Sequence, residues 1–304
     1  MDAADPDAAE PAPDRLPHPT RAHESAAADA EPAWRRAIAH VAARSSGGPL
    51  PEHVRITVHF HPDRPVAGAT VIERIAETGA YLPQFATGIS NGGLTAHPGG
   101  DRWRWESRMF GGAYDGAAPE ERSVYGALEH RGWPMGGAIR FGSCWLELSP
   151  GAWPRMTLCW PDSVLEPTDV GTPERAGDLL ALADASAHDL LDDYVEVQLH
   201  GGLDVRRDAA RLVLDPSFRG TAVADAAHGL GVPVTWHAGR VLELDRVGEL
   251  EDYRGVDVLA LAASLAVDGR LDARRLGEAA ADHDPQAIKR VWHLIARFGH
   301  GVAD

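Results

Sequence analysis

Short segments that alternate between apolar and polar side chains constrain the fold of this chain most. Residues 54–60 (VRITVHF) and 194–200 (YVEVQLH) alternate in this way and contain β-branched residues, so both are predicted strands. Further strands are predicted at residues 125–130, 138–148, 155–160, 209–214 and 232–236. Helices are predicted at residues 33–43, 69–81, 174–191, 221–230, 258–268 and 273–300. Because the strands cluster and the helices are interspersed, the sequence predicts the α+β class.

The chain divides into three predicted regions. Residues 1–30 consist mainly of Ala, Asp, Glu and Pro and are predicted to be a disordered tail, because they bury too little apolar surface to offset chain entropy. Residues 31–255 form the predicted main α+β domain with the functional site, and residues 256–304 form a helical extension packed on it. Residues 84–122 lack long periodic segments and are predicted to be mostly loop, although their aromatic residues argue against disorder.

The composition restricts the partners of the chain. The formal net charge is -16, so a broad surface for nucleic acid or for anionic membranes is not expected. Two cysteines are too few for a disulfide framework, and neither a leader nor a bilayer-spanning apolar segment is found. These features favour a soluble cytoplasmic protein. A local basic pocket is compatible with this composition, in which Lys289 is the only lysine.

Glycine-rich polar loops between residues 54 and 148 are typical of a small-molecule site. The segment TGISNGG offers Ser90, Asn91 and Gly92, whose N–H groups and polar side chains can hold an anion or a carboxamide. The segment contains neither GxxxxGK[ST] nor GxGxxG, so a standard phosphate loop is not predicted. A tight connection between two elements is the alternative interpretation.

His59 and His61 stand two residues apart at the end of a predicted strand, so their side chains are expected on the same face. Two imidazoles on one face can bind a metal ion. Candidates for the remaining ligands are Asp63, His130, His200 and His237. The sequence has no HExxH motif and no CxxC pair, which favours the other interpretation: His59, His61 and Arg64 bind a substrate without a metal.

The segment YVEVQLH places Glu196 and Gln198 on the polar face of its predicted strand. Such a face can hold a ribose or stabilise a developing positive charge, or it can simply face water. Ser143 begins another predicted strand and lacks the GxSxG context of a nucleophile. We expect its hydroxyl either to support a catalytic carboxylate or to be purely structural.

Several of these segments together resemble DUF3626, a family of uncharacterised bacterial proteins. The resemblance is carried by HFHPDR, TGISNGG, GGDRWRWE, FGGAY, YGAL, RFGS, VGT, YVEVQLHGG, LDPSFRGT and VPVTWHAG, and it covers about residues 50–255. This family resemblance implies no activity.

The order of the polar residues also resembles that of ADP-ribosyltransferases. That fold is a split β-sandwich with flanking helices, with Arg or His on its first strand, Ser or Tyr on a middle strand and a catalytic Glu on a late strand. His59 and Arg64, then Tyr125 and Ser143, then Glu196 follow the same order here. The usual Glu/Gln-x-Glu is replaced by Tyr-Val-Glu at residues 194–196, which leaves acceptors other than arginine, or plain hydrolysis, as options.

The ADP-ribosyltransferase resemblance implies cleavage of the nicotinamide–ribose bond of NAD, with NAD as substrate and no metal required. The implied acceptor is unidentified, and a protein is one option. The implied catalytic residues are Glu196, His59, Tyr125 and Ser143. The implied NAD-binding residues are His61, Arg64, Ser90, Asn91, Gly92, Tyr114 and Gln198. Two alternatives stand beside it: a metal-dependent hydrolase built on His59 and His61, and a non-enzymatic nucleotide-binding module.

Overall fold

A computed structural model describes residues 31–89, 94–245 and 253–301 of the chain. The predicted tail at residues 1–30 and the loop residues Ser90, Asn91 and Gly92 lie outside the described residues. By its internal contacts the chain separates into Met1–Pro32 and Ala33–Asp304, and the fold below is that of the second unit. The predicted boundary near residue 255 is not part of this division and stays a prediction.

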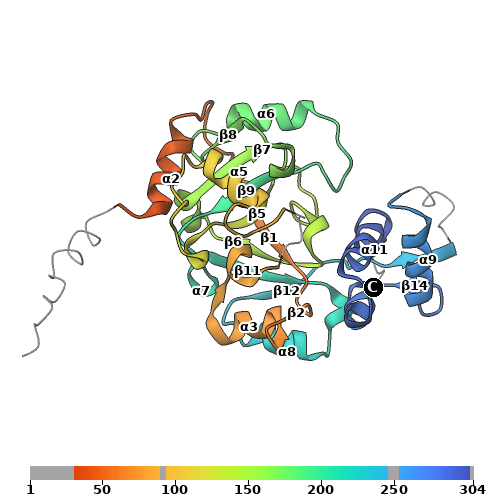
Figure 1. Cartoon of the computed structure of the whole chain (residues 1–304). Helices are drawn as coiled ribbons and strands as arrows, with labels where there is room; N and C mark the ends of the chain where they lie inside the picture. Colours follow the sequence, from red (N-terminus) through yellow and green to blue (C-terminus); the bar gives the residue numbers. More distant parts are fainter. Residues whose placement is uncertain (1–30, 90–93, 246–252, 302–304) are drawn as a thin grey trace, which may run out of the picture. The chain divides into compact units, whose positions relative to one another are not determined.

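The described strands form one eight-stranded sheet in the order β12-β11-β6-β1-β5-β9-β7-β8 (Figure 1). Only β11 and β12 pair in parallel within it. The members are β1 (Arg55–Phe60), β5 (Val124–Glu129), β6 (Cys144–Leu148), β7 (Met156–Trp160), β8 (Asp169–Gly171), β9 (Val195–Leu199), β11 (Ala209–Leu214) and β12 (Val234–Trp236). The predicted α+β class is therefore confirmed. The eight principal strands lie in one continuous sheet, and the other described strands pair two by two. The finer expectation of a split β-sandwich stays a prediction.

Three two-stranded sheets and several helices complete the fold. The small sheets pair β10 (Leu203–Asp204) with β4 (Ala80–Tyr81), β13 (Leu242–Glu243) with β14 (Arg270–Leu271), and β2 (Pro65–Val66) with β3 (Ala69–Thr70). The α-helices are α2 (Ala33–Ala42), α3 (Val71–Thr78), α4 (Gln84–Thr87), α5 (Asp101–Met109), α6 (Gly177–Ala185), α7 (Val205–Asp208), α8 (Ala222–His228), α9 (Val256–Leu265), α10 (Ala273–Ala279) and α11 (Pro285–Phe298). Short 3-10 helices span Pro119–Glu121, Ile139–Phe141, Pro150–Arg155, Ser163–Leu165, Pro216–Phe218 and Ala280–Asp282. Among the described helices, none combines the length and the apolar character needed to cross a bilayer.

The two faces of the large sheet differ in chemistry because its strands alternate. One face is apolar and packs against α3, α6 and α8 in the main core, to which Ile56, Leu146 and Val197 belong. The other face carries polar side chains that are nevertheless buried, among them Thr57 and Glu196. Helices α2 and α5 pack over part of this polar face in a second cluster that includes Cys159 of β7. A polar face that is shielded from water is unusual for a plain structural sheet.

The sheet opens at its centre between β1 and β5. Their pairing ends where Thr57 meets Ala127. Beyond this pair, β1 continues to Phe60 against β6 alone, and β5 runs back to Val124 against β9 alone. The two central strands therefore diverge, and a gap opens between their ends.

Residues 84–122 are mostly loop among the described residues, as predicted, but they contain helix α5, which the sequence did not predict. It buries Arg102, Trp105, Glu106 and Met109, which are spaced three and four residues apart as on one helix face. Two of these four side chains are charged, so the segment lacks the apolar periodicity that sequence prediction depends on.

Other predicted boundaries shift because of capping. Helix α3 begins after Thr70, whose side chain and Glu73 form a capping box, and ends at Gly79 in the left-handed conformation with φ 71°. The predicted helix at residues 273–300 is two helices, since Asp284 caps α11 by accepting from the N–H groups of Gln286 and Ala287. Of the predicted strand at 138–148 only β6 is extended, and of the predicted helix at 174–191 only α6 is helical.

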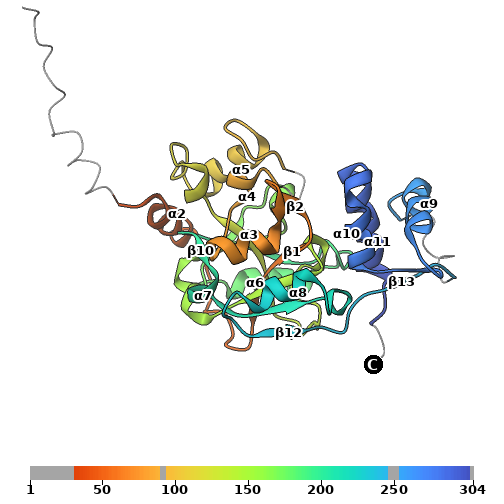
Figure 2. The same cartoon turned by 90° about the horizontal axis from the view of Figure 1, so that it is seen from below.

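The C-terminal helices α9, α10 and α11 gather on one side of the sheet (Figures 1 and 2). Val258, Leu276 and Trp292 of these helices belong to the same core cluster as the strands. Trp292 also donates from Nε1 to the carbonyl oxygen of Ile139 at 2.9 Å. The C-terminal region therefore shares its apolar core with the rest of the unit.

Candidate functional site

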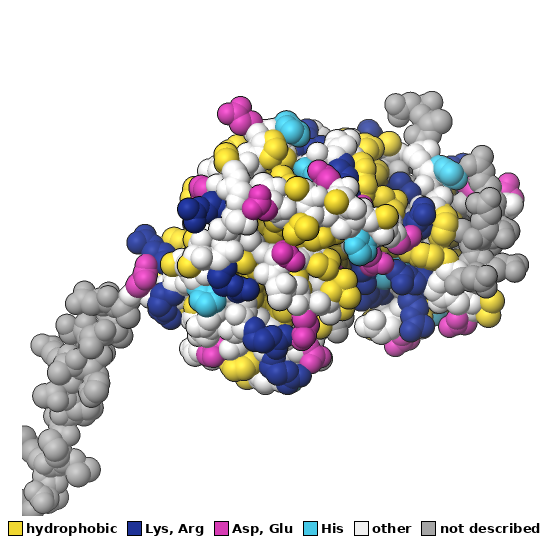
Figure 3. All heavy atoms as spheres, turned by 90° about the horizontal axis from the view of Figure 1, so that it is seen from above, with side chains coloured by type: hydrophobic (Ala, Val, Ile, Leu, Met, Phe, Trp, Pro, Cys, Tyr) yellow, Lys and Arg dark blue, Asp and Glu magenta, His cyan; other side chains and the backbone are white. Residues whose placement is uncertain are grey.

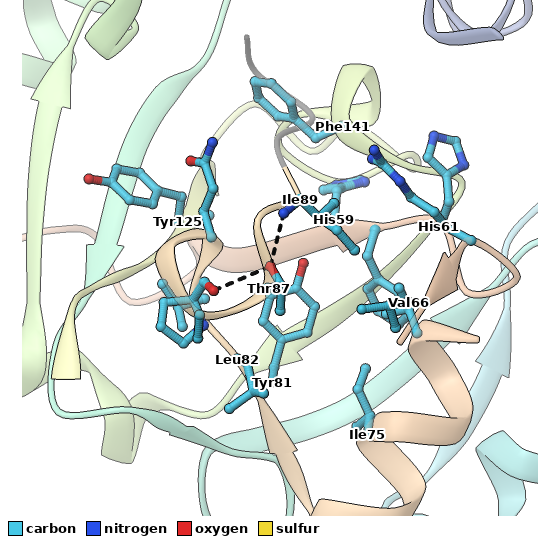
Figure 4. Close-up of a pocket in the computed structure, with 18 of the residues that line it drawn as sticks. His59, His61, Val66, Ile75, Tyr81, Leu82, Thr87, Ile89, Tyr125 and Phe141 are labelled. Carbon is cyan, nitrogen blue, oxygen red and sulfur yellow. Dashed lines mark hydrogen bonds between the residues drawn. The ribbon is translucent and has the colours of Figure 1, made fainter. Parts of the chain in front are cut away.

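A cavity of about 470 Å³ lies where β1 and β5 diverge (Figure 4). Its lining brings together His59 from β1, Tyr125 from β5 and Glu196 from β9, three neighbouring strands of the sheet. Helix α3 and the segment that follows it supply an apolar wall with Ile75 and Leu82. Cavities of this size and mixed lining are typical of small-molecule sites.

The Glu196 carboxylate makes several polar contacts at the wall of the cavity. Its Oε2 accepts a hydrogen bond of 2.7 Å from Ser163, and its Oε1 accepts one of 3.0 Å from Gln198. A guanidinium nitrogen of Arg102 lies 3.8 Å from Oε1. Since only 4 % of Glu196 is exposed, these groups fix the carboxylate at the cavity wall.

Burial raises the pKa of Glu196 to about 7, and the nearby carboxylate of Asp162 adds to this rise. Arg102 and the hydrogen bonds from Ser163 and Gln198 oppose it. The carboxyl group therefore changes its charge near neutral pH, which suits a group that acts on a substrate.

Arg102 and Glu106 stand one turn apart on α5 and reach the polar face of the sheet. The Arg102 guanidinium donates to Ser163 at 2.6 Å and lies 4.1 Å from the centre of the Tyr125 ring. Burial alone would lower the pKa of Arg102, but Tyr125 and Glu196 raise it above its usual value. Among the described residues, its Nε has no hydrogen-bond partner although it is buried. Such a buried donor without a partner is an exception among buried polar groups.

The hydroxyl end of Tyr125 is bound by Glu106. The Tyr125 hydroxyl donates to Glu106 at 2.6 Å, and Arg122 pairs with the same carboxylate at 2.5 Å. Burial, together with the charge of Glu106, raises the pKa of Tyr125 well above its usual value. The phenol is therefore neutral, and its ring forms a fixed wall of the cavity.

His59 lines the cavity on the other side of the gap from Tyr125, whose ring points away from it (Figure 4). Its Nδ1 lies 3.1 Å from the carbonyl oxygen of Gly142, and its Nε2 accepts from the N–H of Ala138 at 3.5 Å. Because a carbonyl only accepts, we assign the proton to Nδ1. Burial lowers the pKa of His59 to about 3, so the imidazole is neutral at physiological pH.

His61 and Arg64 line the same cavity from the loop after β1. His61 lies beyond the end of β1 and packs edge-on against Trp292, with ring centres 4.9 Å apart. Burial lowers the pKa of His61 to about 3 and also lowers that of Arg64. Five predicted site residues therefore meet in one cavity: Glu196, His59, Tyr125, His61 and Arg64.

Three other predicted site residues lie outside this lining. Gln198 is buried behind Glu196 and orients it. The Tyr114 hydroxyl lies 2.8 Å from His200 in the cluster beneath α2 and α5, away from the cavity. Ser143 contacts Cys144, and its carbonyl oxygen faces His237 at 2.8 Å. The predicted role of Ser143, a hydroxyl that holds the carboxylate, belongs in the structure to Ser163.

The candidates for a metal ligand set are dispersed. His130 pairs with Asp184, while His200 contacts Tyr114 and Thr157. Over residues 31–89, 94–245 and 253–301, no group of three or more His, Cys, Asp or Glu side chains is arranged to hold a metal ion.

Sequence reasoning did not identify Arg102, Asp162 and Ser163 as site residues. Arg102 was contained in the motif GGDRWRWE, but its role depends on the helix that was not predicted. Asp162 and Ser163 follow β7, at the cis peptide bond between Trp160 and Pro161, and carry no local motif. Only the sheet order, with β7 next to β9, brings them to Glu196.

Comparison with known proteins gives a family but no activity. No functionally curated protein matches the chain. A family profile described as "Protein of unknown function (DUF3626)" matches residues 55–184 and 174–297, which include every described residue of the cavity lining. Because the match covers most of the sequence, the chain belongs to the DUF3626 family.

Proposed function

We propose that this protein cleaves the nicotinamide–ribose bond of NAD and transfers the ADP-ribosyl group to an acceptor or to water. The observation that carries the proposal is the convergence of His59, Tyr125 and Glu196 in one cavity. They come from the adjacent strands β1, β5 and β9, in the chain order expected for an ADP-ribosyltransferase.

Bond cleavage needs a group that stabilises positive charge on the ribose. Nicotinamide leaves as a neutral molecule with the bonding electron pair, and the cation develops at the ribose carbon. An ionised Glu196, fixed by Ser163 and Gln198, faces this position without having to reorganise. A water molecule or a nucleophile of the acceptor then attacks the ribose carbon and loses its proton.

The remaining cavity residues suit the other parts of NAD. Tyr125 offers a ring that is fixed in place. The neutral imidazole of His59, whose two nitrogens contact Gly142 and Ala138, lines the cavity beside it. Arg64 and Arg74 line the cavity on the side of α3 and match the charge of the pyrophosphate. The Arg102 guanidinium also lines the cavity and adds positive charge.

The test is to incubate the purified full-length protein with NAD and to measure released nicotinamide by chromatography. Release above the rate without protein is the expected result. Saturable NAD binding without release would replace the proposal by the nucleotide-binding module. Stoichiometric zinc, together with activity that chelators abolish, would replace it by the hydrolase.

A further inference from the structure

A second cavity of about 310 Å³ lies between the loop after β1 and the C-terminal helices α10 and α11. Leu276, Ile288 and Trp292 give it an apolar wall. His61 and Arg64 line both this cavity and the first one. The two cavities therefore adjoin at these two side chains.

Basic groups concentrate around the second cavity. Lys289 lines it, and burial together with Arg140, Arg254 and Arg64 lowers the pKa of its ammonium group to about 8. His293, one turn further along α11, is only 4 % exposed, and neither ring nitrogen has a hydrogen-bond partner among the described residues. A gathering of basic side chains is unusual in a chain of net charge -16. In Figure 3, Lys and Arg side chains gather on the side where α11 lies in Figure 1, and other basic groups lie along the lower edge of that face.

We infer that the second cavity binds a phosphoryl group, held by Arg64 and Lys289 with an N–H of His61. A guanidinium fork and an ammonium group are the side chains that proteins use for phosphate. The apolar wall formed with Trp292 gives room for the organic part of a phosphorylated ligand. The inference does not require NAD cleavage, because it rests on the charge and shape of the second cavity, although Arg64 and His61 also line the first.

One acidic side chain shares this cavity and is compatible with an anion. Asp63 lies against α10 so closely that a Cβ on Gly277 would be 1.7 Å from its carboxylate oxygen. Burial, with nearby Glu278, raises the pKa of Asp63 to about 7. At or below neutral pH much of this carboxyl is therefore protonated, and it can donate to a phosphoryl oxygen.

The phosphoryl group can come from two sources. Because the two cavities share part of their lining, two probes of different length distinguish these sources. It belongs either to a nucleotide whose other end occupies the first cavity or to a separate phosphorylated molecule. Inorganic pyrophosphate is the probe for the phosphoryl site itself. ADP-ribose is the probe for a ligand that spans both cavities.

Lys289 gives a direct readout, because it is the only lysine in the chain. The full-length protein is treated with an amine-acetylating reagent, and the labelled Lys289 peptide is quantified by mass spectrometry, with the α-amino group as internal reference. Pyrophosphate at ten times its dissociation constant should slow labelling of Lys289 about tenfold, since about a tenth of the sites stays free. The α-amino group should label at an unchanged rate.

Two variants define the site. Arg64→Gln should abolish protection by pyrophosphate, whereas Arg290→Gln should leave it intact. Arg290 is the exposed neighbour of Lys289 on α11, so it matches the change in charge without touching the cavity. If Arg64→Gln does not fold, calorimetric titration of Lys289→Gln replaces it, and pyrophosphate binding should be lost.

Every outcome has a defined meaning. Protection by ADP-ribose that is stronger than that by pyrophosphate supports a ligand spanning both cavities. Protection by pyrophosphate alone supports a separate phosphorylated ligand. Unchanged labelling in the presence of both probes, or equal protection by sodium chloride at the same ionic strength, would overturn the inference, whatever the protein does with NAD.

Discussion

At the scale of single residues, Glu196 is subject to opposing influences. Burial raises its pKa, while Arg102, Ser163 and Gln198 favour its ionised form. The same three contacts fix its position at the cavity wall. The carboxylate therefore has a fixed position and a raised pKa. This combination is typical of functional groups rather than structural ones.

This balance predicts the pH dependence of nicotinamide release. A raised pKa means that ionised Glu196 is scarce below about pH 7 and predominates above it, so the rate should rise through this value. His59 stays neutral over the same range and should not contribute a step. Ser163→Ala removes a bond to the ionised form, so it should move the midpoint to higher pH. Rate profiles between pH 5.5 and 8.5 provide the measurement, and a profile that falls as pH rises would contradict this role.

At the scale of elements, the sequence predicted the strands better than the helix that completes the site. Strands β1 and β9 were predictable because their β-branched residues alternate with polar ones. Helix α5 was not, because two of the four residues on its buried face, Arg102 and Glu106, are charged. A helix that serves a polar site loses the periodicity by which helices are recognised.

The backbone of Gly142, whose carbonyl oxygen contacts His59, lies very close to the backbone of β1. A Cβ on Gly142 would lie 2.2 Å from the backbone carbon of Phe60 in β1, so no side chain fits there. Gly142→Ala should cost about 1–3 kcal/mol of unfolding free energy, as overpacking does. Thermal unfolding should show a fall of several degrees.

The matched control for this change is Gly151→Ala. The nearest atom to a Cβ at that position is the Ser149 hydroxyl at 3.6 Å, which is an ordinary contact. Its melting temperature should stay within about a degree of wild type, since exposed positions tolerate such changes. Equal effects of the two substitutions would show that the close approach at Gly142 does not matter.

At the scale of the whole molecule, the cavity is a product of topology. Its residues come from β1, β5, β9, α5 and the segment after β7, which are far apart in sequence. The chain order of His59, Tyr125 and Glu196 was visible beforehand, but their meeting depends on the strand order β1-β5-β9. The opening between β1 and β5 has no local sequence signal, because it is defined by where their pairing stops.

Two truncations test how the chain divides. Removal of residues 256–304 takes Val258, Leu276 and Trp292 out of the core that the sheet uses, so the remainder should be insoluble or unfolded. Removal of residues 1–30 deletes a segment poor in core-forming residues and outside the family match. That protein should melt within a few degrees of the full chain by calorimetry. A stable, cooperative fragment ending at residue 255 would show that the C-terminal helices are a dispensable addition.

The most direct test of the proposed function compares nicotinamide release by the wild type, Glu196→Gln and Glu147→Gln. Glu147 is an apt control because it lies in the same row across the sheet, Glu147–Thr57–Ala127–Glu196, but not in the cavity lining. We predict that Glu196→Gln folds normally and loses on the order of a hundredfold in rate, while Glu147→Gln stays within a few-fold of wild type. Wild-type turnover in Glu196→Gln, or no nicotinamide release by the wild-type protein, would contradict the proposed function.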